Sequence, residues 1–482
     1  MPDLLNWARE AWPIVVSVVY VAGATWVTVD AVLRKRHGPA IVGWVGLAWL
    51  APVTGALAYF LLGINRIHRS ANALERPSLP GAAVGGDIAT LPPGVEPGLA
   101  GLEGLARLGA LVTGRPLLAG NRVEPLVDGD EAFPAMLAAI ETAERSVTFA
   151  SYIFDNDFAG HAFRDALVRA RDRGVEVRVL IDDVGSHYSR PPMVGELAEA
   201  AIPVAAFLPT RAPRLLRYAN LRNHRKIVVV DGRIGFTGGM NIRAGHWLSR
   251  SPENPVRCVH FRVEGPVVAD MQQVFATDWE FTTGERLGGD RWFAAERGRG
   301  PVAVRGVPDG PDADIDNLPQ LLLGALSVAT RRVRVVTPYF LPEDGLLRAL
   351  QIAALRGVEV DIVVPERSNV PLIDWAMMPQ MPWLLDAGCR VHRVRAPFDH
   401  SKLLVVDGVW SLVGSTNWDA RSLRLNFEYN LECYDRGLAS RLDAVIDAKI
   451  AASTPLLREH LEARPLPLRL RDGLTRLLSP YL

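Results

Sequence analysis

The chain has 482 residues, which corresponds to about three domains of ordinary size. Its 53 Lys and Arg residues balance its 53 Asp and Glu residues, and this zero net charge argues against a large basic surface and a nucleic-acid partner. The three cysteines, Cys258, Cys389 and Cys433, are far apart and odd in number, so they indicate neither a disulfide framework nor a zinc site. We expect no metal and no cofactor.

Residues 1–66 differ in kind from the rest of the chain. Residues 14–33 are apolar except for Ser17, two Thr and Asp30, and residues 41–62 carry no charge. Each stretch has about 20 residues, the length needed to cross a bilayer, so we predict a transmembrane helical hairpin and a multi-pass membrane protein. The alternatives are a cleaved signal peptide, disfavoured because a second span follows without a small-residue cleavage site, and two buried helices of a soluble protein. Basic residues flank both ends about equally, which leaves the orientation open.

Two further segments flank the main body. Residues 67–120 are rich in Gly, Pro, Ala and Leu, and we predict a linker with a short helix around 99–111. A compact α/β body is expected to begin near Asn121. At the other end, residues 466–482 alternate Leu with Arg. This pattern fits a docked C-terminal helix and an amphipathic segment on an anionic membrane surface equally well.

The body reads as two halves, 121–300 and 301–482, with the same order of elements. Arg173-Gly174-Val175-Glu176-Val177 recurs as Arg356-Gly357-Val358-Glu359-Val360. The predicted helices and strands, in chain order, are helix 131–144, strand 146–154, helix 159–173, strand 175–181, then helix 318–329, strand 333–340, helix 345–356 and strand 358–364. This alternation predicts an α/β fold with mostly parallel, helix-covered sheets and a pseudo-symmetric site where the halves meet.

A polar pattern of five residues also occurs twice, at one constant offset. Its members are His224, Lys226, Asp231, Gly238 and Asn241, repeated as His400, Lys402, Asp407, Gly414 and Asn417. In each copy an apolar, β-branched run leads into Asp-Gly, the strongest short signal for a hairpin. The returning strand brings the Asn back beside the His and the Lys. Each copy thus supplies an imidazole, an ammonium and an amide next to a Gly-rich loop, a set that suits a phosphate.

Two further loop residues and the two aspartates of the pattern have different expected roles. Gly239 and Ser415 occupy equivalent positions in the phosphate-binding loops, and the Ser415 hydroxyl is expected to bind the phosphate. Asp231 and Asp407 complete the catalytic motifs. Each sits at the first turn position, where Asp is favoured because it tolerates the left-handed backbone. We therefore expect Asp231 and Asp407 to support the site only indirectly.

These paired motifs resemble those of the phospholipase D superfamily and, within it, the bacterial cardiolipin synthases. The phrases 264–266 and 337–340 and the N-terminal hairpin add to the resemblance. The resemblance implies two α/β halves sharing one site in the bacterial inner membrane. It also implies a phosphohistidine intermediate and phosphatidyl transfer between two phosphatidylglycerol molecules, giving cardiolipin and glycerol. A hydrolytic phospholipase D or nuclease, and an inactive membrane scaffold, are the alternative functions; the oligomeric state stays open.

Members of this family usually place a carboxylate in the strand after each motif, bonded to the histidine of the same half. The second half has Glu428, whereas the first half has Cys258 at the corresponding position. We therefore predict that Glu428 orients His400, which would protonate the leaving glycerol, and that His224 is the nucleophile because it lacks a carboxylate. The other histidines considered, His161, His246 and His260, have no counterpart in the other half, so core or surface roles are expected.

Overall fold

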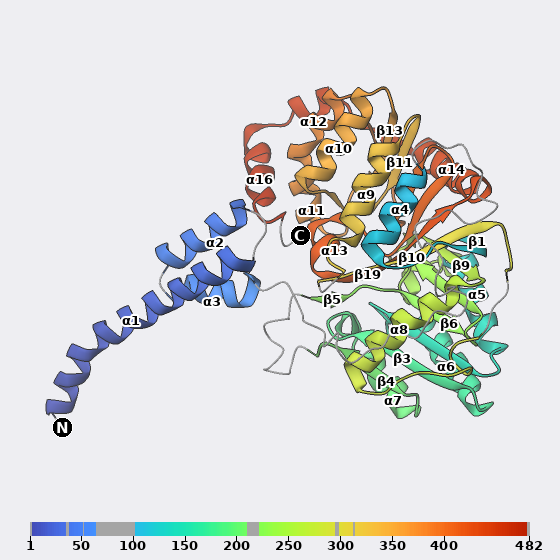
Figure 1. Ribbon diagram of the computed structural model, residues 1–482, viewed down its shortest axis with the longest axis horizontal. Helices are drawn as coiled ribbons and strands as arrows, with labels where there is room; N and C mark the ends of the chain where they lie inside the picture. The colour runs from blue at the N-terminus through green and yellow to red at the C-terminus, as the bar shows by residue number, and fades with distance from the viewer. Residues whose placement is uncertain are drawn as a thin grey trace. The chain divides into compact units, whose positions relative to one another are not determined.

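The computed structural model describes residues 2–34, 38–51, 53–63, 102–209, 221–294, 298–311 and 314–479 (Figure 1). The chain divides into two units, one formed by residues 1–67 with 210–221 and the other by the rest. Residues 35–37 between the two predicted spans and the Gly/Pro-rich part of the predicted linker lie outside the described residues.

The N-terminal unit is helical. Its elements are α1 (Pro2–Arg34), α2 (Gly38–Leu50), α3 (Thr54–Ala58) and the π-helix η1 (Tyr59–Gly63). Within α1, Ala11–Leu33 is long and apolar enough to cross a membrane. Small residues of α1 and α2 pack around Tyr59, whose hydroxyl donates a 2.7 Å hydrogen bond to the Asp30 carboxylate. The acidic residue of the apolar helix therefore has a polar partner inside the unit.

The second predicted span, 41–62, is not one continuous helix. Helix α2 ends at Leu50, and Val53 has a left-handed backbone with φ of 64° before α3 begins. The intervening sequence contains Pro52. Proline removes a backbone donor and its ring clashes with the preceding turn, which is why an uncharged stretch of sufficient length is broken here.

A single large sheet runs through the second unit. Its strand order is β4-β3-β2-β6-β7-β9-β1-β10-β19-β17-β16-β11-β13-β14-β20, and β5 pairs with β19. Two short sheets, β12-β18 and β15-β8, lie apart from it. The strands before residue 300 are β1 (Leu118–Val127), β2 (Ser146–Ser151), β3 (Glu176–Asp182), β4 (Val204–Phe207), β5 (Arg222–Asn223), β6 (Ile227–Val230), β7 (Ile234–Gly238), β8 (Val256–Arg257) and β9 (Val259–Glu264). Those after it are β10 (Val302–Asp309), β11 (Arg332–Val336), β12 (Phe340–Leu341), β13 (Glu359–Pro365), β14 (Arg390–Val394), β15 (Phe398–Asp399), β16 (Leu403–Val406), β17 (Trp410–Gly414), β18 (Trp418–Asp419), β19 (Asn426–Tyr434) and β20 (Ser453–Pro455).

The prediction of a mostly parallel sheet is wrong. Strands β2, β3 and β4 pair in parallel, as do β11, β13 and β14. All pairings along the central run from β6 through β1 and β10 to β16 are antiparallel. The reason is that strands joined by a tight turn, such as β6 and β7, have to run in opposite directions.

The four helices predicted in the two halves are present as α5, α6, α9 and α10, each within three residues of its predicted limits, and the second unit has further helices that were not predicted. The α-helices are α4 (Leu102–Thr113), α5 (Asp128–Glu141), α6 (Phe158–Asp172), α7 (Met193–Glu199), α8 (Val267–Thr283), α9 (Asn317–Val328), α10 (Asp344–Leu355), α11 (Pro371–Met377), α12 (Met381–Asp386), α13 (Ala420–Arg424), α14 (Arg436–Ala451), α15 (Arg458–Glu462) and α16 (Leu466–Arg476). Short 3₁₀ turns are η3 (Gly185–Tyr188), η5 (Ala244–His246), η6 (Leu248–Arg250) and η7 (Met378–Gln380). The limits of α6 have local causes: the Asp157 carboxylate caps its N-terminus, and Gly174, with φ of 86°, follows its C-terminus.

The body begins earlier than Asn121. Helix α4, predicted as a short piece of the linker, packs against α9, and its Leu102, Leu105 and Ala106 belong to the apolar core beneath strands β11 and β13. A separate core lies under β2 and β3. Part of the segment assigned to the linker is therefore structural, because its apolar face completes the core of the second half.

Candidate active site

The two Asp-Gly turns bind the backbone of the neighbouring strand. Asp231 and Asp407 both have φ of 54°, as expected for the first position of the turn. The Asp231 carboxylate accepts hydrogen bonds from the backbone N–H groups of Arg145 and Ser146 at 2.7 and 3.0 Å. Asp407 binds the start of β11 in the same way. These contacts hold the hairpins in place and are consistent with the indirect role predicted for both residues.

Each motif histidine is attached to a strand of the other half. Strand β5 runs parallel to β19, and the His224 N–H donates to the Phe427 carbonyl at 2.9 Å. Strand β15 runs parallel to β8, and the His400 N–H donates to the Arg257 carbonyl at 2.7 Å. The chain therefore crosses between halves just before each histidine.

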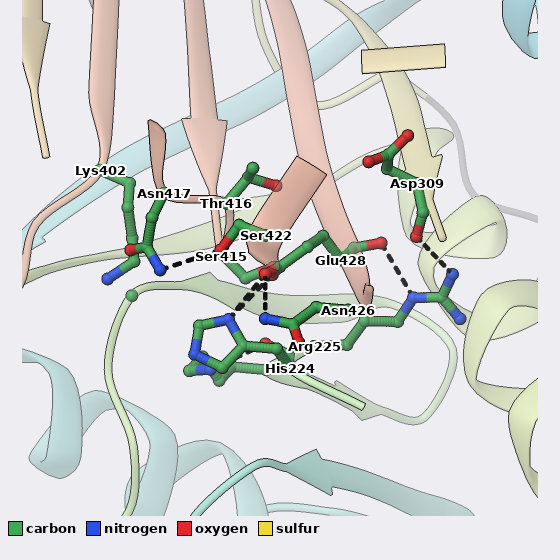
Figure 2. Close-up of polar contacts among 12 residues, drawn as sticks. His224, Arg225, Asp309, Lys402, Ser415, Thr416, Asn417, Ser422, Asn426 and Glu428 are labelled. Carbon is green, nitrogen blue, oxygen red and sulfur yellow. Dashed lines mark hydrogen bonds and ion pairs between the residues drawn. The ribbon is translucent and has the colours of Figure 1, made fainter. Parts of the chain in front are cut away.

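Because of this crossing, the Glu428 carboxylate contacts His224 and not His400 (Figure 2). His224 Nδ1 lies 2.9 and 3.0 Å from the two oxygens of Glu428. The same carboxylate accepts hydrogen bonds from the Ser415 hydroxyl and from Asn426 Nδ2. The predicted pairing of Glu428 with His400 is wrong. Glu428 is on β19, and β19 pairs with β5, the strand that leads directly into His224.

His400 is held by a neutral group instead. Its Nδ1 lies 2.8 Å from the Gly239 carbonyl oxygen, which only accepts, so Nδ1 carries the proton. The Cys258 thiol lies beside this contact, 3.4 Å from the His400 carbonyl. Burial raises the pKa of Cys258 to about 12, so the thiol is uncharged. The two imidazoles thus have the same tautomer but different electrostatic support.

Two buried lysines add positive charge. Lys226 and Lys402 each donate a 2.7 Å hydrogen bond to the carbonyl of the histidine two residues earlier. Burial lowers the pKa of Lys226 to about 7 and that of Lys402 to about 8. Burial, followed by the charges of the two lysines, holds the pKa of His224 and of His400 well below the usual value. An anion bound between the lysines would offset these effects, which makes the site suited to phosphate.

Both histidines line one cavity of about 900 Å³. The predicted phosphate ligands Asn241 and Asn417 line the same cavity. Ser415 differs from the prediction: it is fully buried, and its hydroxyl binds the Glu428 carboxylate. Gly239 contributes its carbonyl to His400, and a side chain there would lie 2.6 Å from the His400 carbonyl oxygen. Close approach of the halves thus explains this glycine.

Three aromatic residues lie beside the motif histidines without a predicted role in the site, and one of them, His246, was expected in the core or on the surface. The Tyr152 ring lies 5.1 Å from the His224 ring, and the rings of Tyr339 and His246 lie 6.1 and 6.4 Å from that of His400. Burial lowers the pKa of His246 to about 3, so this ring is neutral. Tyr152 and Tyr339 follow the carboxyl ends of β2 and β11, a position where open α/β sheets usually bind ligands. The position of the two tyrosines after these strands could therefore have predicted their place in the site.

Comparisons with known proteins identify the family. A family model described as "Cardiolipin synthase, PLD-like domain" matches residues 136–279 and 322–450. The chain is 30% identical over 480 residues to a cardiolipin synthase of Geobacillus kaustophilus, covering 97% of this chain and 93% of that one. It is 34% identical over 369 residues to a cardiolipin synthase of Staphylococcus aureus, covering 76% and 74% of the two chains. Among solved structures, phosphatidylserine synthase of Haemophilus influenzae has a similar fold, with a TM-score of 0.62 at 15% identity over 79% of this chain and 100% of that one.

Proposed function

The chain belongs to the cardiolipin synthase family of the phospholipase D superfamily, and we propose that its two histidines divide the chemistry of phosphatidyl transfer between them. It is a membrane-associated enzyme that acts on phospholipids. Phosphatidylglycerol is both donor and acceptor in this proposal, and the products are cardiolipin and glycerol. One observation carries this division of roles: His224 Nδ1 contacts a carboxylate, whereas His400 Nδ1 contacts a backbone carbonyl.

His224 is the nucleophile. Its Nδ1–H donates to Glu428, which leaves the Nε2 lone pair for attack on the phosphorus atom. The bond from phosphorus to the headgroup glycerol breaks, and the imidazole becomes positively charged as the phosphatidyl group joins it. A carboxylate at hydrogen-bond distance stabilises that charge. The role is the one expected from the sequence, but the reason is reversed: His224 is favoured because it has the carboxylate.

His400 transfers the protons. Its Nε2 gives a proton to the oxygen of the leaving glycerol and then takes one from the attacking hydroxyl of the second phosphatidylglycerol. His400 has no carboxylate to hold it permanently charged. The bound phosphate supplies the missing negative charge by offsetting Lys226 and Lys402, so protonation of His400 follows substrate binding.

Lys226, Lys402, Asn241 and Asn417 bind the non-bridging oxygens of the phosphate. The two amides line the cavity, and each lysine Nζ lies 2.7 Å from the carbonyl of its motif histidine, directly behind the cavity wall. Fixed donors and charges of this kind stabilise charge that grows in the transition state. In this mechanism the enzyme uses neither a metal nor a cofactor.

Two pseudo-symmetric halves share this site, preceded by a membrane hairpin. The strand order repeats from β4 to β1 and again from β14 to β10, which supports two related halves. Helices α1 and α2 pack together through small residues, which supports a hairpin even though the second arm is broken. A multi-pass protein of the bacterial inner membrane is the corresponding location.

Two measurements test the function. The chain is expressed in a host that lacks its own cardiolipin synthases, and cardiolipin is expected to appear; phosphatidic acid in its place would indicate transfer to water. Trapping tests the roles. Phosphatidylglycerol labelled at its phosphorus is mixed with purified enzyme and quenched in alkaline denaturant, because phosphohistidine hydrolyses in acid. Label is expected on the peptide that contains His224 in the unmodified enzyme, and label on the peptide that contains His400 would reverse the assignment.

A further inference from the structure

Helix α16 carries a row of leucines that no described residue covers. Leu466, Leu470, Leu474 and the following Leu477 are between 57% and 74% exposed. Their spacing of three and four residues places them on one face of the helix. A surface helix usually turns its apolar face inward, and here the apolar face is turned outward.

The orientation of this row is set by the opposite face of α16. Asp472 and Thr475 are buried, and the helix packs against α11. The Arg471 guanidinium lies 4.2 Å from the centre of the Trp375 ring on α11, a cation–π contact. The C-terminal helix is therefore docked, as one of the two interpretations expected, and docking directs its leucines away from the protein.

Helix α16 is linked to the active-site cavity through α11. Helix α11, which α16 packs against, contributes Ile373 to the cavity lining, and Asn369 and Val370 just before it line the cavity as well. Leu372 on α11 and Trp383 on α12 are also 39% and 44% exposed. Figure 1 shows α16 alongside α11 and α12. One helix thus connects an exposed apolar surface to the cavity that holds His224 and His400.

The charges that α16 places around the row are mainly basic, and one of its arginines, Arg476, lies 3.8 Å from the Asp344 carboxylate on α10. Arg469 is exposed, and Arg471 and Arg476 are partly exposed on α16. The single acidic residue of the helix, Asp472, is buried and paired with Arg464 and Arg471. Leucines flanked by arginines are the pattern of helices that lie in the interface of an anionic bilayer.

We propose that α16 is a membrane-contact surface, with its leucine row inserted among the acyl chains of an anionic bilayer and its arginines at the headgroups. In this position α11, which lines the cavity through Ile373, is held close to the lipid that contains phosphatidylglycerol. The inference rests on the proposed function for the identity of the lipid. The alternative occupant is a second copy of the chain, but the basic flanks would repel the same flanks of a second copy.

The test measures the depth of α16 in a bilayer, because the N-terminal helix keeps the chain on the membrane in any case. All three cysteines of the chain are buried, so a spin label on Leu474→Cys reports one site. The full chain is placed in nanodiscs of phosphatidylglycerol and phosphatidylcholine. The label is expected to meet oxygen dissolved in the lipid and to be protected from a water-soluble nickel chelate. A label on Glu199→Cys, exposed on α7, serves as the control and should show the reverse.

Two outcomes would overturn the proposal. Free access of the nickel chelate to the Leu474 label in anionic nanodiscs would show that the row is in water. Protection that appears in detergent, without bilayer, and rises with protein concentration would show that a second copy covers it.

Activity gives an independent reading. Leu470→Glu/Leu474→Glu should lower turnover of phosphatidylglycerol in bilayers at least tenfold and leave turnover of a short-chain analogue in detergent unchanged. Leu111→Glu on α4, where the leucine is equally exposed, should change neither rate. Equal loss in both assays, or equal loss in Leu111→Glu, would refute a membrane role. If the unmodified chain makes no cardiolipin from either lipid, the proposed function fails, while the depth measurement still decides the surface.

Discussion

Replacing Glu428 by Gln keeps the shape of the side chain and removes its charge. The amide oxygen can still accept a hydrogen bond from His224 Nδ1, and the amide N–H₂ can donate to the Ser415 hydroxyl. The loss is the charge-assisted part of the contact. A hydrogen bond to a charged group contributes about 1.5–3 kcal/mol, and each 1.4 kcal/mol is about tenfold in rate. We expect turnover in Glu428→Gln to fall roughly 100-fold, with the fold retained.

The pH profile separates this effect from a general disturbance. Burial raises the pKa of Glu428 to about 7. Below that pH the carboxyl group is protonated and cannot stabilise the charged imidazole, so activity of the unmodified enzyme is expected to fall as pH drops through about 7. A glutamine does not titrate, and the variant should lose this acidic limb.

Glu432→Gln is the matched control, because Glu432 is on the same strand and is equally buried but binds Arg305 and Trp410. This variant should lower the melting temperature, since a buried guanidinium loses its counter-charge, and should keep the acidic limb. Cardiolipin formation by purified enzyme between pH 5.5 and 8.5 is the assay. More than a tenth of the activity in Glu428→Gln, or an unchanged acidic limb, would refute the role assigned to the carboxylate.

Other predictions follow from the same geometry. His224→Ala and His400→Ala should each reduce cardiolipin formation below a hundredth, and retained activity in either would exclude the two-histidine mechanism. Cys258→Asp adds a carboxylate beside His400, so it should keep or raise cardiolipin formation. It should also raise the pKa of His400 and so move the loss of activity on the alkaline side to higher pH. Asp407→Asn keeps one acceptor for the backbone N–H groups of β11 and loses the charge, so it should lower stability by about 1–2 kcal/mol, with activity per folded molecule nearly unchanged; a selective loss of turnover would contradict the structural role. Removal of residues 1–64 should leave a folded body active on short-chain lipid in detergent, since the second unit holds the cavity, and circular dichroism of an unfolded product would show the opposite.

Local patterns in the sequence determined the repeated helices and strands of the body and identified the two motif histidines and two asparagines that line the cavity. The Asp-Gly turns predict the β6–β7 and β16–β17 hairpins, which the structure has. The constant offset between His224 and His400 predicts that both belong to one site, and both line one cavity. Such signals are readable because turns and strands depend on residues close together in the chain. Pro52 indicated in part that the second predicted span, 41–62, would be broken, but the prediction was based on the length of the apolar stretch.

Only the tertiary structure decided which histidine receives the carboxylate. Glu428 is 204 residues from His224 in the chain, and the contact exists because β5 crosses to pair with β19. No periodicity in the sequence predicts that β5 pairs with a strand of the other half, since strand pairing over that distance depends on how the two halves join. The outward leucine row of α16 has the same origin: the sequence shows an alternation of Leu and Arg, and the contact with α11 decides which of them faces the solvent.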